Sequence, residues 1–127
     1  MPGKIKPTES ELSILQILWK LGPSTVRTVN DYLNKQREVG YTTTLKIMQI
    51  MNEKGLVYRN TDQRIHIYTA AVKESDTKNN LIQNLLDSTF SGSAKNLILQ
   101  TLGHHTTTRE ELEEIKRLIQ KIENKDT

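Results

Sequence analysis

The chain has 127 residues, of which 35% are hydrophobic and 26% charged, and its formal net charge at pH 7 is +3. This balance predicts a globular protein of one domain or two small ones and excludes a disordered chain. There are no cysteines, hence no disulfide framework and no thiolate metal site, and no apolar run approaches the roughly 18 residues that a membrane-spanning helix needs. Because the N-terminal residues lack the apolar core of a signal peptide, we expect a cytoplasmic protein that does not associate with a membrane.

Charge and aromatic content divide the chain into two parts. Residues 1–74 hold 11 Lys and Arg against 7 Asp and Glu, and they include five of the six aromatic residues. Residues 75–127 carry a net charge of −1 and a single aromatic residue, Phe90. So short a segment with so little bulk buries too little surface to be stable alone. We therefore expect a basic N-terminal domain at 1–74 and a helical domain at 75–127 that packs against a second copy of itself.

Two helices are predicted at the start of the chain. Thr8 and Glu11 have the spacing of a capping box, and apolar residues follow at helical intervals until Gly22 and Pro23 end the first helix. Ser24 is expected to cap the second helix, because serine is a favoured N-cap residue. The apolar residues of that second helix are Val26, Val29, Tyr32 and Leu33.

The third helix is expected from about Thr42 to Lys54, with Gly55 just beyond its end. Its buried stripe is Leu45, Met48 and Met51, with Ile47 as a further candidate. Its outward residues are Thr42, Thr43, Lys46 and Gln49, with Ile50 as a further candidate. Hydroxyl, amide and ammonium groups on such a helix can bind DNA phosphates or base edges, and the helix dipole favours phosphate at the N-terminus. A run of threonines can equally be a cap with a solvated first turn, so the helix alone leaves both interpretations open.

A β-hairpin is predicted after this helix. Residues 56–59 and 65–69 alternate as strands do, around a polar turn at 60–64. Arg59 and Arg64 lie on the hairpin and could meet phosphates, although lone arginines on a hairpin are more often simply solvated. A helix, a glycine stop and a basic hairpin in this order indicate a winged helix-turn-helix, in which one helix enters a DNA groove beside a wing.

The second part of the chain is helical by pattern. Ser75 is expected to cap a helix that carries Leu81 and Leu85, residues 91–93 to break it, and Gly103 to end a short helix that follows. The last helix begins after Thr107 or Thr108 and has a narrow apolar seam typical of helices that pair. The seam residues are Leu112, Ile115, Leu118, Ile119 and Ile122. We expect the seam, with the two leucines of the earlier helix, to contact a second subunit; packing within its own subunit is the alternative.

The sequence contains no catalytic, metal or cofactor motif. No glycine-rich phosphate loop follows a strand, and residues 91–93 are not a nucleophile elbow. His66 has no second ligand at a metal-binding spacing, so it is interpreted as an ordinary strand residue of the hairpin. We therefore expect a protein that is not an enzyme and that needs no metal or cofactor.

Three segments carry a resemblance to a known family: Thr8–Leu12 with Ile17–Trp19, Tyr41–Thr43 through Glu53–Val57, and Tyr68 at the close of the hairpin. Together they resemble the penicillinase and methicillin-resistance repressor (BlaI/MecI) family of winged-helix transcriptional regulators. Their order and spacing match over about residues 8–72, and the helical remainder has the length of that family's dimerisation domain. The resemblance implies a mainly α fold with a small β-hairpin, and a homodimer that binds double-stranded DNA at a palindromic operator and represses transcription.

The resemblance also implies roles for individual residues. Thr42, Thr43 and Lys46 would face the major groove, and Arg64 would reach the DNA backbone from the wing. The full set expected to bind DNA is Tyr41, Thr42, Thr43, Lys46, Gln49, Arg59 and Arg64. The family often has a small hydroxyl residue where Lys46 stands and an arginine where Ile50 stands, so the operator sequence is expected to differ.

Two further expectations concern partners. In antibiotic-resistance relatives a membrane sensor-protease triggers cleavage in the dimerisation domain, which makes such a protease a candidate partner. The corresponding region lies near Leu99, but Gln100 and Thr101 do not match the asparagine and bulky residue of those relatives. The alternative to a repressor is a winged-helix protein-interaction module that does not bind DNA; it gains weight if the basic residues do not share a face with Thr42 and Thr43.

Overall fold

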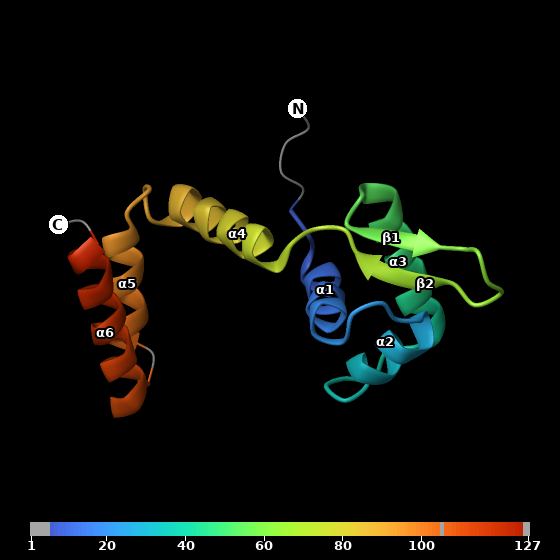
Figure 1. The fold of residues 1–127 in the computed structure, drawn as a ribbon, viewed down its shortest axis with the longest axis horizontal. Coiled ribbons are helices and arrows are strands. Elements are labelled where there is room, and N and C mark those ends of the chain that lie inside the picture. The colour runs from blue at the N-terminus through green and yellow to red at the C-terminus, as the bar shows by residue number, and fades with distance from the viewer. Residues whose placement is uncertain (1–5, 105, 126–127) are drawn as a thin grey trace. The chain divides into compact units, whose positions relative to one another are not determined.

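The computed structural model describes residues 6–104 and 106–125, and Figure 1 shows the elements in chain order. Three helices come first: α1 (Glu9–Leu21), α2 (Val26–Leu33) and α3 (Tyr41–Lys54). Two antiparallel strands follow, β1 (Val57–Asn60) and β2 (Ile67–Ala70). Three more helices complete the chain: α4 (Glu74–Thr89), α5 (Ala94–His104) and α6 (Arg109–Lys125). The predicted fold, a winged helix-turn-helix with a small hairpin followed by a helical region, is confirmed by this order.

The chain divides into two compact units within α4. The first unit ends at Ile82 and the second begins at Gln83. The sequence placed the division between residues 74 and 75, at the start of this helix. The first turns of α4 therefore belong with the first unit, where Thr77 is buried.

Both ends of α1 are closed by the residues that the sequence singled out. The Thr8 hydroxyl accepts a hydrogen bond from the Glu11 N–H at 3.1 Å, and the Glu11 carboxylate accepts one from the Thr8 N–H at 2.9 Å. These two bonds form a capping box, which satisfies two N–H groups that the helix itself leaves without acceptors. At the other end Gly22 adopts a φ of 83°, a backbone conformation that side chains disfavour.

The predicted cap of α2 was wrong by one residue. The N-cap is Thr25, whose hydroxyl accepts from the Thr28 N–H at 3.1 Å. Ser24 is instead buried and forms a β-bridge with Tyr68, with N–H to carbonyl distances of 2.9 and 2.8 Å in the two directions. Because this pairing holds Ser24 in the sheet, the helix begins one residue later.

The hairpin strands also begin later than predicted. Leu56 lies outside β1 because its N–H closes α3 by donating to the Met51 carbonyl at 2.9 Å. Strand β2 begins at Ile67, which pairs with Asn60. Ile65 lies in the connection between the strands and is 63% exposed. The wing is therefore a short hairpin with a long connecting loop.

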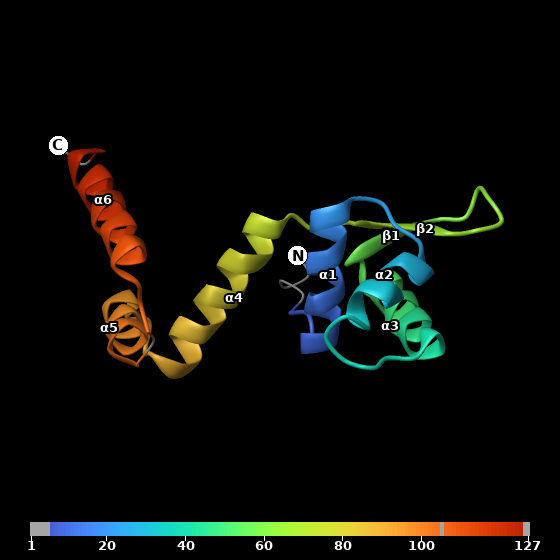
Figure 2. The ribbon, with the colours of Figure 1, turned by 90° about the horizontal axis from the view of Figure 1, so that it is seen from below.

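A single hydrophobic core joins α1, α2, α3 and the hairpin, which gather in the first unit as Figure 2 shows. Its buried residues are Ile14, Leu15, Leu18, Val26, Val29, Leu33, Met48, Met51, Leu56, Val57 and Tyr68. The Trp19 indole N–H donates to the Val72 carbonyl at 3.0 Å and ties α1 to the segment after β2. Since protein cores are packed as tightly as organic crystals, this core is a rigid support for α3.

Helices α4, α5 and α6 bury much less surface. Helix α4 begins at Glu74, so Ser75 lies within its first turn and the prediction that it caps the helix was wrong. Thr108 caps α6 by accepting from the Glu111 N–H at 3.1 Å. None of the side chains that the structure describes in α5 or α6 is buried. Within residues 6–104 and 106–125, no helix has the length and apolarity needed to cross a membrane.

Candidate functional site

The N-terminus of α3 has no side-chain cap. Its N-cap residue is Gly40, which has no side-chain oxygen to accept from the first-turn N–H groups, whereas α1 and α2 are capped by threonines. Thr42 and Thr43 are exposed within the first turn of the helix and do not cap it. Uncapped N–H donors at the positive end of a helix dipole make a favourable location for an anion such as phosphate.

The outer face of α3 is polar. The side chains of Thr42, Thr43, Lys46 and Gln49 are all exposed, and Ile50 is the one aliphatic residue among them. Because residues three and four apart are neighbours on a helix, Thr42, Lys46 and Gln49 form one row along it. The row presents hydroxyl, ammonium and amide groups, which are the donors and acceptors that bind base edges and phosphates.

The buried stripe of α3 differs from the prediction at one residue. Thr44 is fully buried, and Leu45, predicted to be buried, is half-buried at the border of the polar face. The Thr44 hydroxyl lies 2.6 Å from the side-chain amide of Asn30 on α2. Turned so that its NH₂ faces Thr44, that amide also reaches the carbonyl oxygens of Val39 at 3.1 Å and Gly40 at 3.3 Å. A buried hydroxyl is stable here because it is hydrogen-bonded, and the bond fixes the start of α3 against α2.

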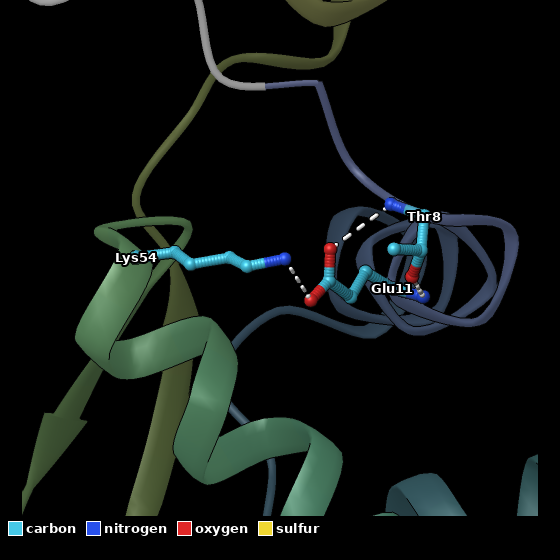
Figure 3. A network of polar contacts seen from close by, with 3 residues as sticks. All are labelled: Thr8, Glu11 and Lys54. Carbon is cyan, nitrogen blue, oxygen red and sulfur yellow. Dashed lines mark hydrogen bonds and ion pairs between the residues drawn. The ribbon is translucent and has the colours of Figure 1, made fainter.

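The C-terminal end of α3 is held by an ion pair (Figure 3). The Lys54 Nζ is 2.8 Å from a carboxylate oxygen of Glu11, whose side chain is 4% exposed against 37% for Lys54. The same carboxylate accepts the Thr8 N–H, so α3 is tied to the capping box of α1. Burial alone would raise the pKa of Glu11, but the hydrogen bonds from Lys54 and Thr8 and the Lys54 charge outweigh burial and lower it.

A hollow of about 360 Å³ lies beside the N-terminal half of α3. It is lined by Thr25, Val26, Arg27, Tyr41, Leu45, Arg64, Ile65, His66 and Tyr68. These residues come from the starts of α2 and α3, from β2 and from the loop between the strands. The hollow thus brings two of the residues predicted from the sequence, Tyr41 and Arg64, to one place beside the polar face.

Arg27 is a candidate that the sequence analysis missed. Its guanidinium carbon lies 5.6 Å from the centroid of the Tyr41 ring, within the range of a cation–π contact. Arg27 is the second residue of α2 and is exposed. Its position in the first turn of a predicted helix was the signal that the sequence offered. Its contact with Tyr41 depends on the packing of α2 against α3, which the sequence does not show.

Arg59 is a predicted DNA-binding residue that the hollow does not include. It is exposed on β1, pairs with Tyr68 and does not line the hollow. Alternation along the strand places it on the same face as Val57. The hollow beside the polar face of α3 therefore includes Arg27 and Arg64 but not Arg59.

The residues predicted to contact a second subunit lie on α4 and α6. Leu81 and Ile115 are half-buried. The others are exposed: Leu85, Leu112, Leu118, Ile119 and Ile122. Aliphatic side chains this exposed on two helices mark a surface that gains free energy when it is covered.

The region predicted to correspond to a cleavage site lies inside α5. Gln100 and Thr101 are exposed, and the Thr101 hydroxyl donates to the Leu97 carbonyl at 2.8 Å. They are therefore in a helix and not in a loop, where proteolytic nicking concentrates.

Among the described residues, no group of three or more His, Asp or Glu is placed to hold a metal ion.

Comparison with known proteins points to one family. A family model described as penicillinase repressor matches residues 7–121. The methicillin resistance regulatory protein MecI of Mammaliicoccus sciuri is 22% identical over 114 residues, which cover 90% of this chain and 93% of that protein. The penicillinase repressor of Staphylococcus aureus is 20% identical over 122 residues, covering 96% and 97% of the two chains. The solution structure of the DNA-binding domain of the repressor BlaI aligns with a TM-score of 0.51 at 24% identity, over 57% of this chain and 90% of that domain, which indicates a shared fold.

Proposed function

Because the chain belongs to the penicillinase repressor family, we propose that it is a sequence-specific repressor that binds a palindromic DNA operator as a homodimer. The family is one of DNA-binding transcriptional repressors and not of enzymes. The observation that carries the finer proposal is the polar face of α3, where Thr42, Lys46 and Gln49 form an exposed row beside an uncapped helix N-terminus. In the proposed complex each α3 enters a major groove, and the two half-sites are about 34 Å or a multiple of this apart.

The dependence of binding on salt tests the proposal. Each phosphate that a lysine or arginine neutralises releases counterions, so log K falls linearly with log salt, with a slope of about −0.9 per phosphate. We expect operator affinity to fall by on the order of 10³ between 50 and 200 mM salt, as measured by fluorescence anisotropy on fragments selected from genomic DNA. Binding that ignores salt, or no binding to any genomic fragment, would contradict the proposal.

Lys46→Ala tests whether the polar face of α3 reads bases. If Lys46 contacts a base edge, its removal should cost about 1–3 kcal/mol of discrimination at one base pair and leave the other positions unchanged. The measurement is a set of affinities for operators substituted one base pair at a time. Lys20→Ala removes the same charge from the last turn of α1, outside the polar face of α3, and serves as the control. Equal weakening on every operator variant would assign Lys46 to a phosphate.

Arg27→Ala tests the hollow as a contact with the DNA backbone. A phosphate contact carries no sequence information, so all operators should lose affinity alike and the salt slope should become shallower by about 0.9. Lys35→Ala is a matched control, because Lys35 is also an exposed cation that lies over a tyrosine ring. Its Nζ is 4.0 Å from the centroid of the Tyr32 ring, just beyond the C-terminal end of α2. If Arg27→Ala changes neither the operator affinity nor the slope of log K against log salt, Arg27 does not contact the DNA.

The rival interpretation is a winged-helix module that binds proteins and not DNA. The arrangement favours DNA, because Lys46 shares the α3 face with Thr42 and Thr43, and Arg64 lies beside that face. The position of Arg59 outside this group is the one point in favour of the rival. A sensor-protease partner would in addition have to open α5, since Gln100 and Thr101 lie within that helix.

A further inference from the structure

The hollow beside the N-terminal half of α3 has an apolar lining. Val26, Leu45 and Tyr68 belong to the core or pack against it, and Ile65 comes from the loop between the strands. Ile65 is 63% exposed, although the residues before it in that loop, 61–64, are all polar. An aliphatic side chain held this far out of the core gains free energy when an apolar group covers it. The hollow is thus suited to hold an apolar group.

Cationic side chains line the same hollow. Arg27 reaches it from α2 and Arg64 from the loop between the strands, and the imidazole of His66 adds a polar ring beside them. The sequence predicted His66 as an ordinary strand residue, but it precedes β2, which begins at Ile67. None of the described residues that line the hollow is acidic, so no carboxylate offsets the two guanidinium charges there. The hollow therefore attracts an anion.

Tyr41 orients one of the two guanidinium groups. The guanidinium carbon of Arg27 lies 5.6 Å from the centroid of the Tyr41 ring. A guanidinium placed against an aromatic ring still directs its N–H donors outward at its edge, where they bind a carboxylate or a phosphate in pairs. The contact with Tyr41 thus holds Arg27 ready for an anion at the hollow.

The size of the hollow indicates the class of ligand. Its volume of about 360 Å³ falls within the range of small-molecule sites, about 300–1,000 Å³. Such sites are mostly apolar and contain a few polar groups that fix the orientation of the ligand. A DNA phosphate would meet the arginines, but the polar sugar–phosphate chain has no apolar group to match the aliphatic lining. A small molecule with both an anionic group and an apolar body matches both.

We propose that the hollow binds a small organic anion, a carboxylate or phosphate on an aromatic or branched aliphatic body, and that this ligand displaces the operator. The anionic group lies against Arg27 and Arg64, and the body lies against Leu45 and Ile65. The displacement rests on the proposed function, because it needs bound DNA to compete with.

Competition of this kind requires no change in the fold. The ligand occupies arginines that would otherwise neutralise DNA phosphates, and it adds a negative charge beside the polar face of α3. Both effects weaken a complex whose affinity depends on phosphate neutralisation. Release of the operator by a ligand also needs no proteolysis, and Gln100 and Thr101 lie within helix α5.

Three probes at constant ionic strength separate the anionic group from the apolar body. Benzyl phosphate carries both, inorganic phosphate only the anion, and benzyl alcohol only the body. At the usual ligand efficiency, a probe of about 12 non-hydrogen atoms binds with a Kd of about 2 mM. By mass action, about 10 mM benzyl phosphate should then raise the apparent Kd for the operator about sixfold, as measured by fluorescence anisotropy. The other two probes should raise it less than about twofold, because each lacks one half of the match.

Nuclear magnetic resonance spectra of the full-length chain without DNA locate the probe. Benzyl phosphate should shift the amide signals of Tyr41 and His66 and leave that of Lys35 in place. Ile65→Ser should raise the Kd of benzyl phosphate about fivefold by removing part of the apolar lining. Tyr58→Ser is the matched control, because Tyr58 is 68% exposed on the same hairpin and does not line the hollow; its effect should stay within about twofold.

The outcomes separate this proposal from the proposed function. If inorganic phosphate displaces the operator as strongly as benzyl phosphate, or if Ile65→Ser leaves the Kd of benzyl phosphate unchanged, the hollow is a phosphate contact and the proposal is overturned. A probe that binds in the hollow but leaves operator affinity unchanged overturns the displacement. Operator binding without any probe reports separately on the proposed function. If it is absent while benzyl phosphate shifts the amides of the hollow, the repressor proposal and the displacement fail, whereas the ligand site stands.

Discussion

Replacing Lys54 by methionine is expected to lower the free energy of unfolding by about 2–3 kcal/mol. The substitution leaves the Glu11 carboxylate, 4% exposed, without the ammonium that lies 2.8 Å away. Removing one partner of a fully buried ion pair costs about 3–5 kcal/mol, and the partial exposure of Lys54 reduces that cost. Equilibrium unfolding in urea at pH 7, followed by circular dichroism, measures the effect.

The double variant Lys54→Met with Glu11→Gln is the control for this prediction. The glutamine can still accept the Thr8 N–H but carries no charge, so most of the lost stability should return. A double variant as unstable as Lys54→Met alone would mean that the lysine acts by packing and not by charge. A loss below about 0.5 kcal/mol in the single variant, the size of an ordinary surface pair, would also contradict the prediction.

The same pair predicts a dependence on pH. The pKa of Glu11 is lowered in the folded protein, so the pair stabilises the fold above the unfolded-state pKa, and this contribution is lost as pH falls through the folded-state pKa. In Lys54→Met burial is left to raise the pKa of Glu11. The difference in stability between wild type and Lys54→Met should therefore shrink as pH falls from 7 towards 3. A difference that stays constant over this range would exclude Glu11 as the group responsible.

Ile119→Asp is expected to lower operator affinity by on the order of 10² or more. A charge in the apolar seam of α6 should dissociate the proposed dimer, because each copy would bring a carboxylate into a covered surface. A monomer engages one half-site and loses the gain of binding two linked sites, which commonly reaches 10²–10⁴. Sedimentation velocity measures whether the dimer dissociates. Fluorescence anisotropy on a full operator and on an isolated half-site measures the loss of operator affinity.

Gln120→Asp is the matched control for Ile119→Asp. It introduces the same charge one residue further along α6, outside the seam, and should leave both the dimer and operator affinity within about twofold of wild type. If Ile119→Asp remains dimeric and binds the operator normally, the seam of α6 has no part in assembly. If both variants dissociate, added negative charge and not the apolar seam would explain the result.

The local signals in the sequence predicted the element order well. The capping box of Thr8 and Glu11 and the glycine ends of α1 and α3 depend on residues only a few positions apart. Local hydrogen bonds and backbone preferences are sufficient to place such features. The same holds for Thr108 at the start of α6.

Two of the errors arose where a distant residue competes for a local group. Ser24 does not cap α2 because its backbone pairs with Tyr68. Thr44, and not Leu45, takes the core position in α3 because Asn30 supplies a partner for its hydroxyl. No periodicity in the sequence reveals partners of this kind, since they are brought together only by the packing of helices.

The sequence by itself determined the fold class, the winged-helix order of elements and the set of polar residues on the outer face of α3. Those properties follow from local spacing and chain composition. Only the tertiary structure decided how α3 is held, at one end by Asn30 and at the other by Glu11 through Lys54. It also placed Arg27 over Tyr41 beside that face. Contacts between residues far apart in the chain depend on how the elements pack, because side chains that meet in space need share no pattern in sequence.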